Sequence, residues 1–241
     1  MQEQLWFTDL LNKALGGPVN QLLQNPHLPA AFHPANPKAP ITNTVAMELL
    51  VTIILIVLFF LVRSRLSVEK PRATQHTVEL LDEFVRGECA NVIGHRYQRF
   101  VPMLTTMFVF ILFCNLIGVI PGFESPTGYK PPAVPLGLAV ISFVYYNFHG
   151  IRVKGVWGYF KHFLILPTEI ISHLSRLLSL TVRLWANIFA GDLITRVFFS
   201  LIPLALPVVF NLLHIFVAVL QAYVFMLLTI IYLSGAVTEE H

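Results

Sequence analysis

Long runs of apolar residues are the feature that most limits how this chain can fold. The first run covers 45–62 and ends at two arginines, Arg63 and Arg65. A helix needs about 20 mostly apolar residues to cross the hydrocarbon core of a bilayer, so this run is predicted to be a membrane helix. Four further membrane helices are predicted at about 100–120, 133–148, 164–200 and 208–237.

The composition fits a membrane protein and excludes several soluble classes. Hydrophobic residues make up 56% of the 241 positions and charged residues only 12%, whereas soluble domains carry about 25% charged residues. So few charges cannot cover a soluble globule, which excludes an ordinary cytoplasmic enzyme, a disordered chain and a coiled coil. The formal net charge of +3 is too small to indicate a nucleic-acid partner. The predicted fold class is therefore an all-α integral membrane protein with about five membrane helices.

The predicted membrane domain covers 44–241 and is preceded by a leader at 1–43. The leader is polar and partly helical, and it lacks the basic segment and short apolar core of a signal peptide. After the first span, apolar residues recur at helical spacing between charged ones at about 74–98, which predicts an amphipathic helix on the membrane surface. The basic and aromatic stretch at 150–162 is predicted to be a loop at the membrane interface.

Lysine and arginine alternate in number from one connecting segment to the next. There are two in 1–43, seven in 63–99, one in 121–132 and three in 150–162. Cytoplasmic loops carry the excess of basic residues, so the leader is expected outside and the 74–98 helix inside. Five crossings then return the C-terminus to the cytoplasm. This multi-pass topology and the lack of a presequence favour a bacterial plasma (inner) membrane.

The last two apolar segments are too long to cross a membrane upright. At 1.5 Å per residue, a helix over 164–200 is about 55 Å long and one over 208–237 about 45 Å, whereas the hydrocarbon core is about 30 Å thick. Each helix is therefore expected to tilt strongly. Pro203 and Pro207 separate the two, so the pair is predicted to form a slanted hairpin.

Polar and ionisable side chains are concentrated in this hairpin, although an ionisable group at mid-bilayer costs about 2.5–3.5 kcal/mol. At 100° per residue, Arg176 and Arg183 share a face of the first helix, and Asp192 lies about 180° from Arg183. His214 and Gln221 share a face of the second helix, which could meet either Asp192 or Arg183. The hairpin is therefore predicted to hold the functional residues.

The ionisable groups of the hairpin divide into a fixed charge and several titratable groups. Arginine keeps its proton in proteins, so Arg183 can attract a carboxylate but cannot relay protons. The titratable candidates for a proton relay are Glu169, His173, Asp192 and His214. Arg176 and Arg196 have a simpler alternative explanation, because long basic side chains can reach from an apolar helix to the membrane surface.

Several motifs in this chain resemble subunit a of F-type ATP synthases, from about residue 75 to the end. The segment 179–192, Ser-Leu-Thr-Val-Arg-Leu-Trp-Ala-Asn-Ile-Phe-Ala-Gly-Asp, is similar to the family's signature around an arginine. The segment 115–122 resembles the motif that closes an earlier helix, and 214–233 resembles the last helix. Two positions depart from the pattern: Trp185-Ala186 replaces the common Phe-Gly, and Asp192 replaces the common glutamate.

This resemblance implies a stator subunit beside a rotating ring of c subunits, with two offset proton half-channels that couple proton translocation to ATP synthesis. Arg183 is then implied to separate the half-channels and to face the carboxylate of the ring. The residues implied on the proton-uptake side are Asp192, His214, Asn187 and Gln221. The last two could instead position Arg183. The residues implied on the proton-release side are Glu169, Ser172, His173 and Arg176.

The resemblance also implies the partners of the chain. They are the c-subunit ring, the b subunits of the peripheral stalk, the remaining ATP synthase subunits and membrane lipid, without nucleic acid. No Walker A sequence occurs, so nucleotide hydrolysis is expected on other subunits. No cofactor is expected, and the two cysteines, Cys89 and Cys114, indicate neither a metal site nor a disulfide.

Two other classes of membrane protein compete with this interpretation. An ion-coupled secondary transporter could also hold ionisable groups at mid-membrane. Such transporters often show duplicated halves and broken helices, and the sequence shows neither. An intramembrane enzyme such as a metalloprotease would need a motif such as His-Glu-x-x-His or Gly-x-Ser-x-Gly, and the chain contains neither.

Overall fold

The computed structural model is built from helices and describes residues 5–24, 39–64, 73–94, 97–120, 123–128, 132–165, 167–201 and 206–237. Within these ranges, the side chains at 74, 154, 156–165, 167–170, 172–174, 196, 199–201 and 206–208 lie outside the description. The helices are α1 (Trp6–Leu23), α2 (Asn43–Arg63), α3 (Ala73–Ile93), the 3-10 turn η2 (Tyr97–Arg99), α4 (Val101–Ile117), α5 (Ala133–Ile165), α6 (Pro167–Leu201) and α7 (Leu206–Val237). No strand occurs in the described ranges, and the predicted all-α fold class is confirmed.

Four helical segments are long and apolar enough to cross a membrane. They are Asn43–Arg63, Ala133–Val153, Ser175–Thr195 and Val209–Val237. The helix α4 is also apolar but shorter, with 17 residues. Only 17% of the apolar window in α2 is buried within the chain. A helix that is hydrophobic all round and poorly covered by its own chain is expected to face lipid, so the predicted integral membrane protein is confirmed.

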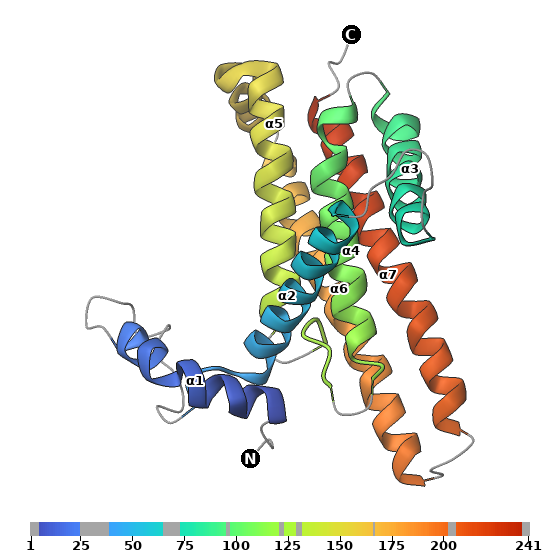
Figure 1. Ribbon diagram of the computed structural model, residues 1–241. Coiled ribbons are helices and arrows are strands. Elements are labelled where there is room, and N and C mark those ends of the chain that lie inside the picture. The colour runs from blue at the N-terminus through green and yellow to red at the C-terminus, as the bar shows by residue number, and fades with distance from the viewer. Residues whose placement is uncertain are drawn as a thin grey trace.

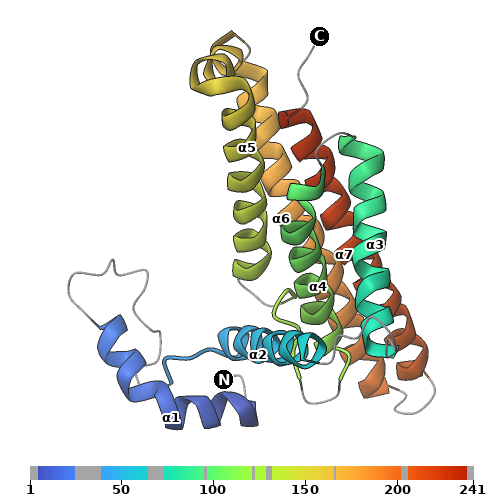
Figure 2. The ribbon, with the colours of Figure 1, turned by 45° about the horizontal axis from the view of Figure 1, so that its top comes forward.

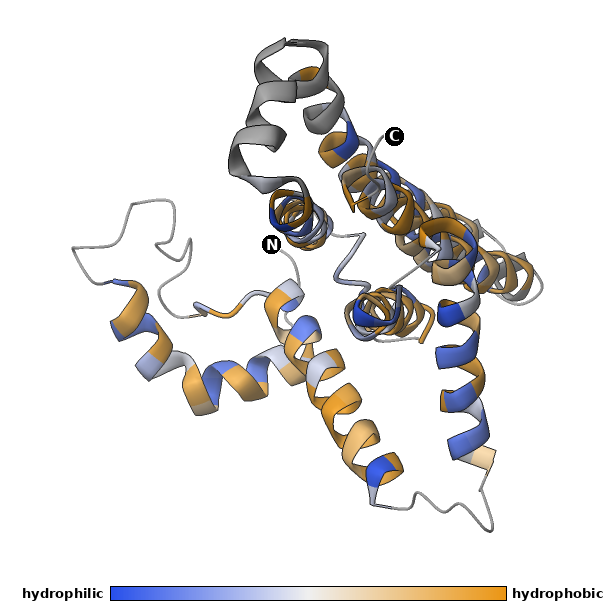
Figure 3. Ribbon diagram, turned by 90° about the horizontal axis from the view of Figure 1, so that it is seen from above, coloured by the Kyte–Doolittle hydropathy of each residue, from blue (hydrophilic) through white to orange (hydrophobic). Residues whose placement is uncertain are grey.

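The helices α4, α5, α6 and α7 form a bundle in which α7 contacts each of the other three (Figures 1 and 2). The helix α3 packs against α4 and α7, whereas α2 packs against α4. Seen from above, α6 and α7 are slanted relative to α4 and α5 (Figure 3). The slanted hairpin of two long helices is therefore present, as the length of the two segments requires.

The helix α5 differs from the expectation that it ends near residue 148 and is followed by a loop. It continues to Ile165, with a kink at Gly155, where φ is 72° and ψ is 158°. Glycine adopts a positive φ without the steric cost that a Cβ imposes. The chain therefore bends at Gly155 and resumes its helix, so the predicted interface loop at 150–162 is helical.

Local sequence signals set several of the helix ends. The Thr42 Oγ1 atom accepts a hydrogen bond from the backbone N–H of Val45 at 3.4 Å and caps the start of α2. Pro102 lies in the first turn of α4, where its missing N–H costs nothing. Gly94 follows α3 with a φ of +73°, the left-handed conformation that commonly ends a helix.

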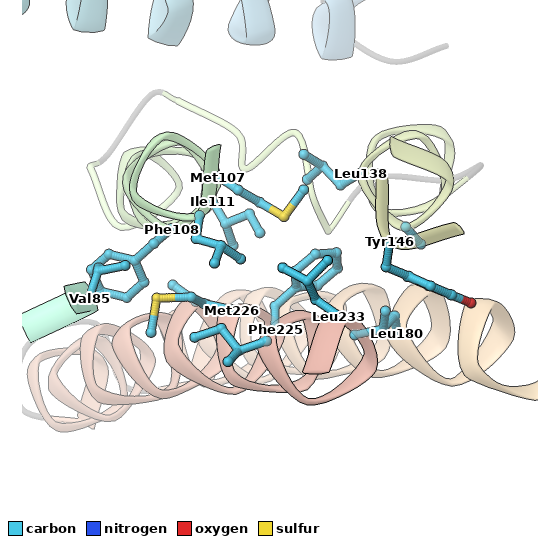
Figure 4. Packing of buried hydrophobic residues seen from close by; sticks show 14 of the residues in the cluster. Val85, Met107, Phe108, Ile111, Leu138, Tyr146, Leu180, Phe225, Met226 and Leu233 are labelled. Carbon is cyan, nitrogen blue, oxygen red and sulfur yellow. The ribbon is translucent and has the colours of Figure 1, made fainter. Parts of the chain in front are cut away.

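Apolar side chains from α3 to α7 form the core of the bundle. Figure 4 shows that side chains of α4 and α5 meet those of α6 and α7. Its labelled members are Val85, Met107, Phe108, Ile111, Leu138, Tyr146, Leu180, Phe225, Met226 and Leu233. One buried polar contact adds to this packing, because Ser142 Oγ donates to Thr229 Oγ1 at 3.0 Å between α5 and α7. Close packing and such hydrogen bonds hold membrane helices together, since lipid supplies no hydrophobic drive between them.

Candidate functional site

A cavity of about 430 Å³ lies between α6 and α7 and brings together four of the predicted site residues. Arg183 and Asn187 line it from α6, and His214 and Gln221 line it from α7. The other lining residues are apolar or small, with Thr195 as the exception. The cavity is therefore an apolar space with a few polar groups on facing helices.

Arg183 is exposed at this cavity. Among the side chains that the structure describes, no carboxylate forms an ion pair with it. An arginine within a membrane segment is costly unless it meets a partner or water. Within the part of the chain whose side chains are described, Arg183 is therefore a cation without a carboxylate partner.

Asn187 and Gln221 connect the two helices next to Arg183. Asn187 Nδ2 donates a hydrogen bond of 2.7 Å to Gln221 Oε1. Gln221 is 4% exposed, whereas Asn187 is exposed. Residues four apart lie on one face of a helix, so this bond is on the same side of α6 as Arg183.

Asp192 and His214 form a second contact between the same helices. Asp192 Oδ1 lies 3.5 Å from His214 Nδ1, and the side chains are 18% and 3% exposed. Among the described residues, no hydrogen-bond partner reaches His214 Nε2. The sequence left open which residues of α6 meet the face of α7 that carries His214 and Gln221. That face of α7 lies against both candidate regions of α6: His214 contacts Asp192, and Gln221 contacts the turn that follows Arg183.

The segment 123–128 approaches Asp192 closely. A Cβ atom at Gly128 would lie 3.0 Å from Asp192 Oδ2 and 2.9 Å from Ile188 Cγ2. Such distances are too short for an ordinary side chain, so only glycine fits at this position without a shift of its neighbours. The backbone of Gly128 therefore forms part of the wall around the Asp192 carboxylate.

A buried polar network holds this segment in place, and the sequence did not indicate it. Thr127 Oγ1 donates to Asn115 Oδ1 at 2.6 Å, and Asn115 Nδ2 donates to the carbonyl oxygen of Ala218 on α7 at 3.3 Å. Ser125 Oγ donates to the carbonyl oxygen of Cys114 at 3.0 Å and lies 2.8 Å from Thr127 Oγ1. An asparagine in an apolar helix was the one available signal, because such a group must find a partner when it is buried.

Arg176 lies away from the cavity. It is half-buried, and its guanidinium carbon lies 4.9 Å from the centroid of the Tyr232 ring on α7. Seven residues separate it from Arg183, which corresponds to about 10 Å along the helix. The side chains of the other predicted release-side residues, Glu169, Ser172 and His173, lie outside the described residues.

Known proteins identify the family of this chain. A family model described as the ATP synthase A chain matches residues 45–234. The chain belongs to the ATP synthase subunit a family. The predicted resemblance is thereby confirmed, and the match includes the four predicted site residues that line the cavity. It begins within α2, so α1 lies outside it.

Individual relatives within the subunit a family support this assignment. The chain is 46% identical to ATP synthase subunit a of Koribacter versatilis (strain Ellin345) over 250 aligned positions, which cover 100% of both chains. It is 47% identical to that of Solibacter usitatus (strain Ellin6076) over 211 positions, covering 84% of this chain and 90% of the relative. With Sulfurimonas denitrificans the identity is 42% over 182 positions, covering 71% and 80%.

Proposed function

We propose that this chain is the stator of the membrane sector of a rotary F-type ATP synthase and provides two proton half-channels beside a ring of c subunits. The observation that carries the proposal is the position of Arg183. It is exposed at the cavity between α6 and α7 without a carboxylate partner among the described side chains. A carboxylate on a passing c subunit is the partner that this arrangement suits.

The fixed charge of Arg183 explains how the two half-channels stay separate. Arginine does not release its proton, so Arg183 blocks proton transfer along α6. At 4 Å and an effective dielectric constant of 20, its attraction for a carboxylate is about 4 kcal/mol before desolvation is subtracted. This attraction favours the ionised carboxylate as the ring subunit passes. A proton that leaked directly across would waste about 2.3 kcal/mol per 100 mV of membrane potential.

Asp192 and His214 are the proposed proton-uptake groups. Both are titratable, they lie 3.5 Å apart, and His214 lines the same cavity as Arg183. A proton taken up at this pair can therefore reach a carboxylate held near Arg183. Asn187 and Gln221 connect the pair to the arginine, or hold the arginine in position. We place proton release at Glu169, Ser172, His173 and Arg176, farther toward the start of α6.

The proposed topology places the N-terminus outside and the C-terminus in the cytoplasm of a bacterium, across its plasma membrane. It follows from the alternating lysine and arginine counts. The proposed partners are the c-subunit ring, the b subunits of the peripheral stalk and the remaining ATP synthase subunits. Nucleotide chemistry belongs to those other subunits.

Substitution of Arg183 tests the proposal. In purified complexes reconstituted into vesicles, Arg183→Ala is expected to reduce proton-driven ATP synthesis to background while the complex still assembles. The proposal also predicts faster passive proton conduction through this variant, because the separator is lost. Arg63→Ala, at the exposed end of α2, is the matched control and should keep its rate. ATP synthesis at the unmodified rate in Arg183→Ala would refute the assignment.

A further inference from the structure

The helix α1 has no role in the proposed function. It spans Trp6–Leu23 and lies outside the segment that matches the family model. It extends sideways from the end of the bundle near the start of α2 (Figures 1 and 2). We propose that α1 is a membrane-surface helix whose apolar face rests on lipid at the end of the membrane where α2 begins.

Hydrogen bonds attach α1 to the residues that lead into α2. Asn12 Nδ2 donates to the carbonyl oxygen of Ile41, and the backbone N–H of Ile41 donates to Asn12 Oδ1, each at 3.0 Å. The backbone N–H of Leu5 donates to Asn43 Oδ1 at 3.4 Å. Because Asn43 is the first residue of α2, α1 is fixed at the level where this membrane helix starts.

The first turn of α1 shows which of its faces points toward the membrane. Phe7 packs against a buried cluster that contains Met47 and Val51 of α2 and Cys114 of α4. These three belong to the apolar helices, so the face of α1 that carries Phe7 points toward the hydrocarbon region. Trp6, whose ring meets that of Phe123 edge-on at 6.2 Å, is of the type that is enriched at membrane interfaces.

The same face continues along α1 beyond the contacts with α2 and α4. Leu10, Leu15 and Leu22 lie within about 60–80° of Phe7 around the helix axis. Their exposed fractions are 56%, 47% and 69%. The apolar stripe on α1 begins in contact with membrane helices, and its later residues are exposed. These exposed residues need an apolar environment at the same depth as the start of α2. The apolar surface of α2 is also poorly covered by protein and needs the same apolar environment.

The opposite face of α1 holds its charged residues and carries no net charge, although Val19 and Leu23 also lie on it. Asp9, Lys13 and Asn20 lie about 120–160° from Phe7. Lys13 Nζ lies 2.6 Å from Asp9 Oδ2, four residues earlier. Figure 3 shows hydrophilic and hydrophobic residues alternating along α1. Surface helices that bind anionic lipid carry several basic residues on the polar face, so this helix is expected to bind through apolar contact alone.

Site-directed spin labelling tests the proposal on the full chain in its purified complex, reconstituted into phosphatidylcholine vesicles. Labels at Leu10→Cys and Leu22→Cys report the proposed lipid face, and labels at Lys13→Cys and Asn20→Cys report the polar face. The native cysteines, Cys89 and Cys114, are buried, and the parent chain gives the background. The ratio of collisions with oxygen to collisions with a water-soluble nickel chelate should be severalfold higher on the lipid face.

The possible outcomes distinguish lipid from water and from protein as the surroundings of this face of α1. High access of the nickel chelate at all four positions would place α1 in water and overturn the proposal. Low access of both oxygen and the chelate at Leu10 and Leu22 would show that protein covers this face, and would also overturn it. The ratio should stay the same when anionic phosphatidylglycerol is added, and a marked rise would contradict the apolar mode of binding. Activity of the complex does not enter these readouts, so they do not depend on the role of Arg183.

Discussion

Asn187 Nδ2 donates a 2.7 Å hydrogen bond to Gln221 Oε1 and joins α6 to α7 one helical turn beyond Arg183. Because Gln221 is almost fully buried, its carbonyl oxygen depends on this donor. The bond also fixes the rotation of α6 about its axis at the turn that carries Arg183. The direction of the arginine toward its proposed partner is therefore set by a contact between residues far apart in the sequence.

Loss of this hydrogen bond should slow ATP-driven proton pumping. Removing one such hydrogen bond costs about 1 kcal/mol, which corresponds to roughly a fivefold change in an equilibrium constant. Asn187→Ala and Gln221→Ala should each lower the pumping rate by about this factor. The double variant should be no slower than the slower single variant, because the two side chains share one interaction. Pumping rates can be measured by dye quenching in vesicles. If the fold-reductions of the two single variants multiply in the double variant, the two side chains do not share one role.

Asp192 is expected to need a titratable side chain. Asparagine cannot take up or release a proton, so Asp192→Asn should lower proton-driven ATP synthesis by at least about 100-fold, the lower end of the effect typical for loss of a proton-transfer group. Asp192→Glu keeps the carboxylate and should retain most of the rate. Asp9→Asn, on the exposed face of α1, controls for the change of charge. Equal rates for Asp192→Asn and the unmodified complex would remove Asp192 from the proton path.

Gly128 should tolerate no side chain, because its Cβ would meet Asp192 and Ile188 at 3.0 Å and 2.9 Å. Gly128→Ala is expected to displace the carboxylate and lower ATP synthesis several-fold, at a stability cost of about 1–3 kcal/mol. The control is Gly137→Ala on α5, where a Cβ would meet nothing within 4 Å. Assembly of both variants should be compared on native gels. If the two variants pump protons equally well, the segment 123–128 does not position Asp192.

Cys89 should resist thiol reagents in the native protein. It lies on α3, outside the predicted spans, and burial raises the pKa of its thiol from 9.0 to about 11. At pH 8 this shift lowers the reactive thiolate fraction about 100-fold, and burial slows the reaction further. Modification by N-ethylmaleimide, followed by mass spectrometry, should increase as the pH approaches 11. Lys13→Cys, on the exposed polar face of α1, should react rapidly at pH 8, and equally rapid reaction of Cys89 would contradict its burial.

Much of the candidate site could be predicted because an ionisable side chain is conspicuous in an apolar helix. Arg183, Asp192 and His214 stand out in segments where each ionisable group carries a cost of about 2.5–3.5 kcal/mol. Asn115 was harder to interpret, since an asparagine near a helix end has many possible partners. Its contacts with Thr127 and Ala218 depend on α4 and α7 lying side by side. No local sequence pattern indicated the close approach of Gly128 to Asp192.

The all-α membrane fold could be predicted from the amino-acid sequence, because apolar length and helical period are properties of single segments and decide whether a segment can cross a bilayer. The slant of the last two helices could be predicted in the same way, since their length exceeds the thickness of the hydrocarbon core. The folded structure was needed to show that His214 meets Asp192 while Gln221 meets Asn187. It was also needed to show that α5 bends at Gly155 and continues. Contacts between helices depend on how whole surfaces pack against one another, and no single segment contains that information.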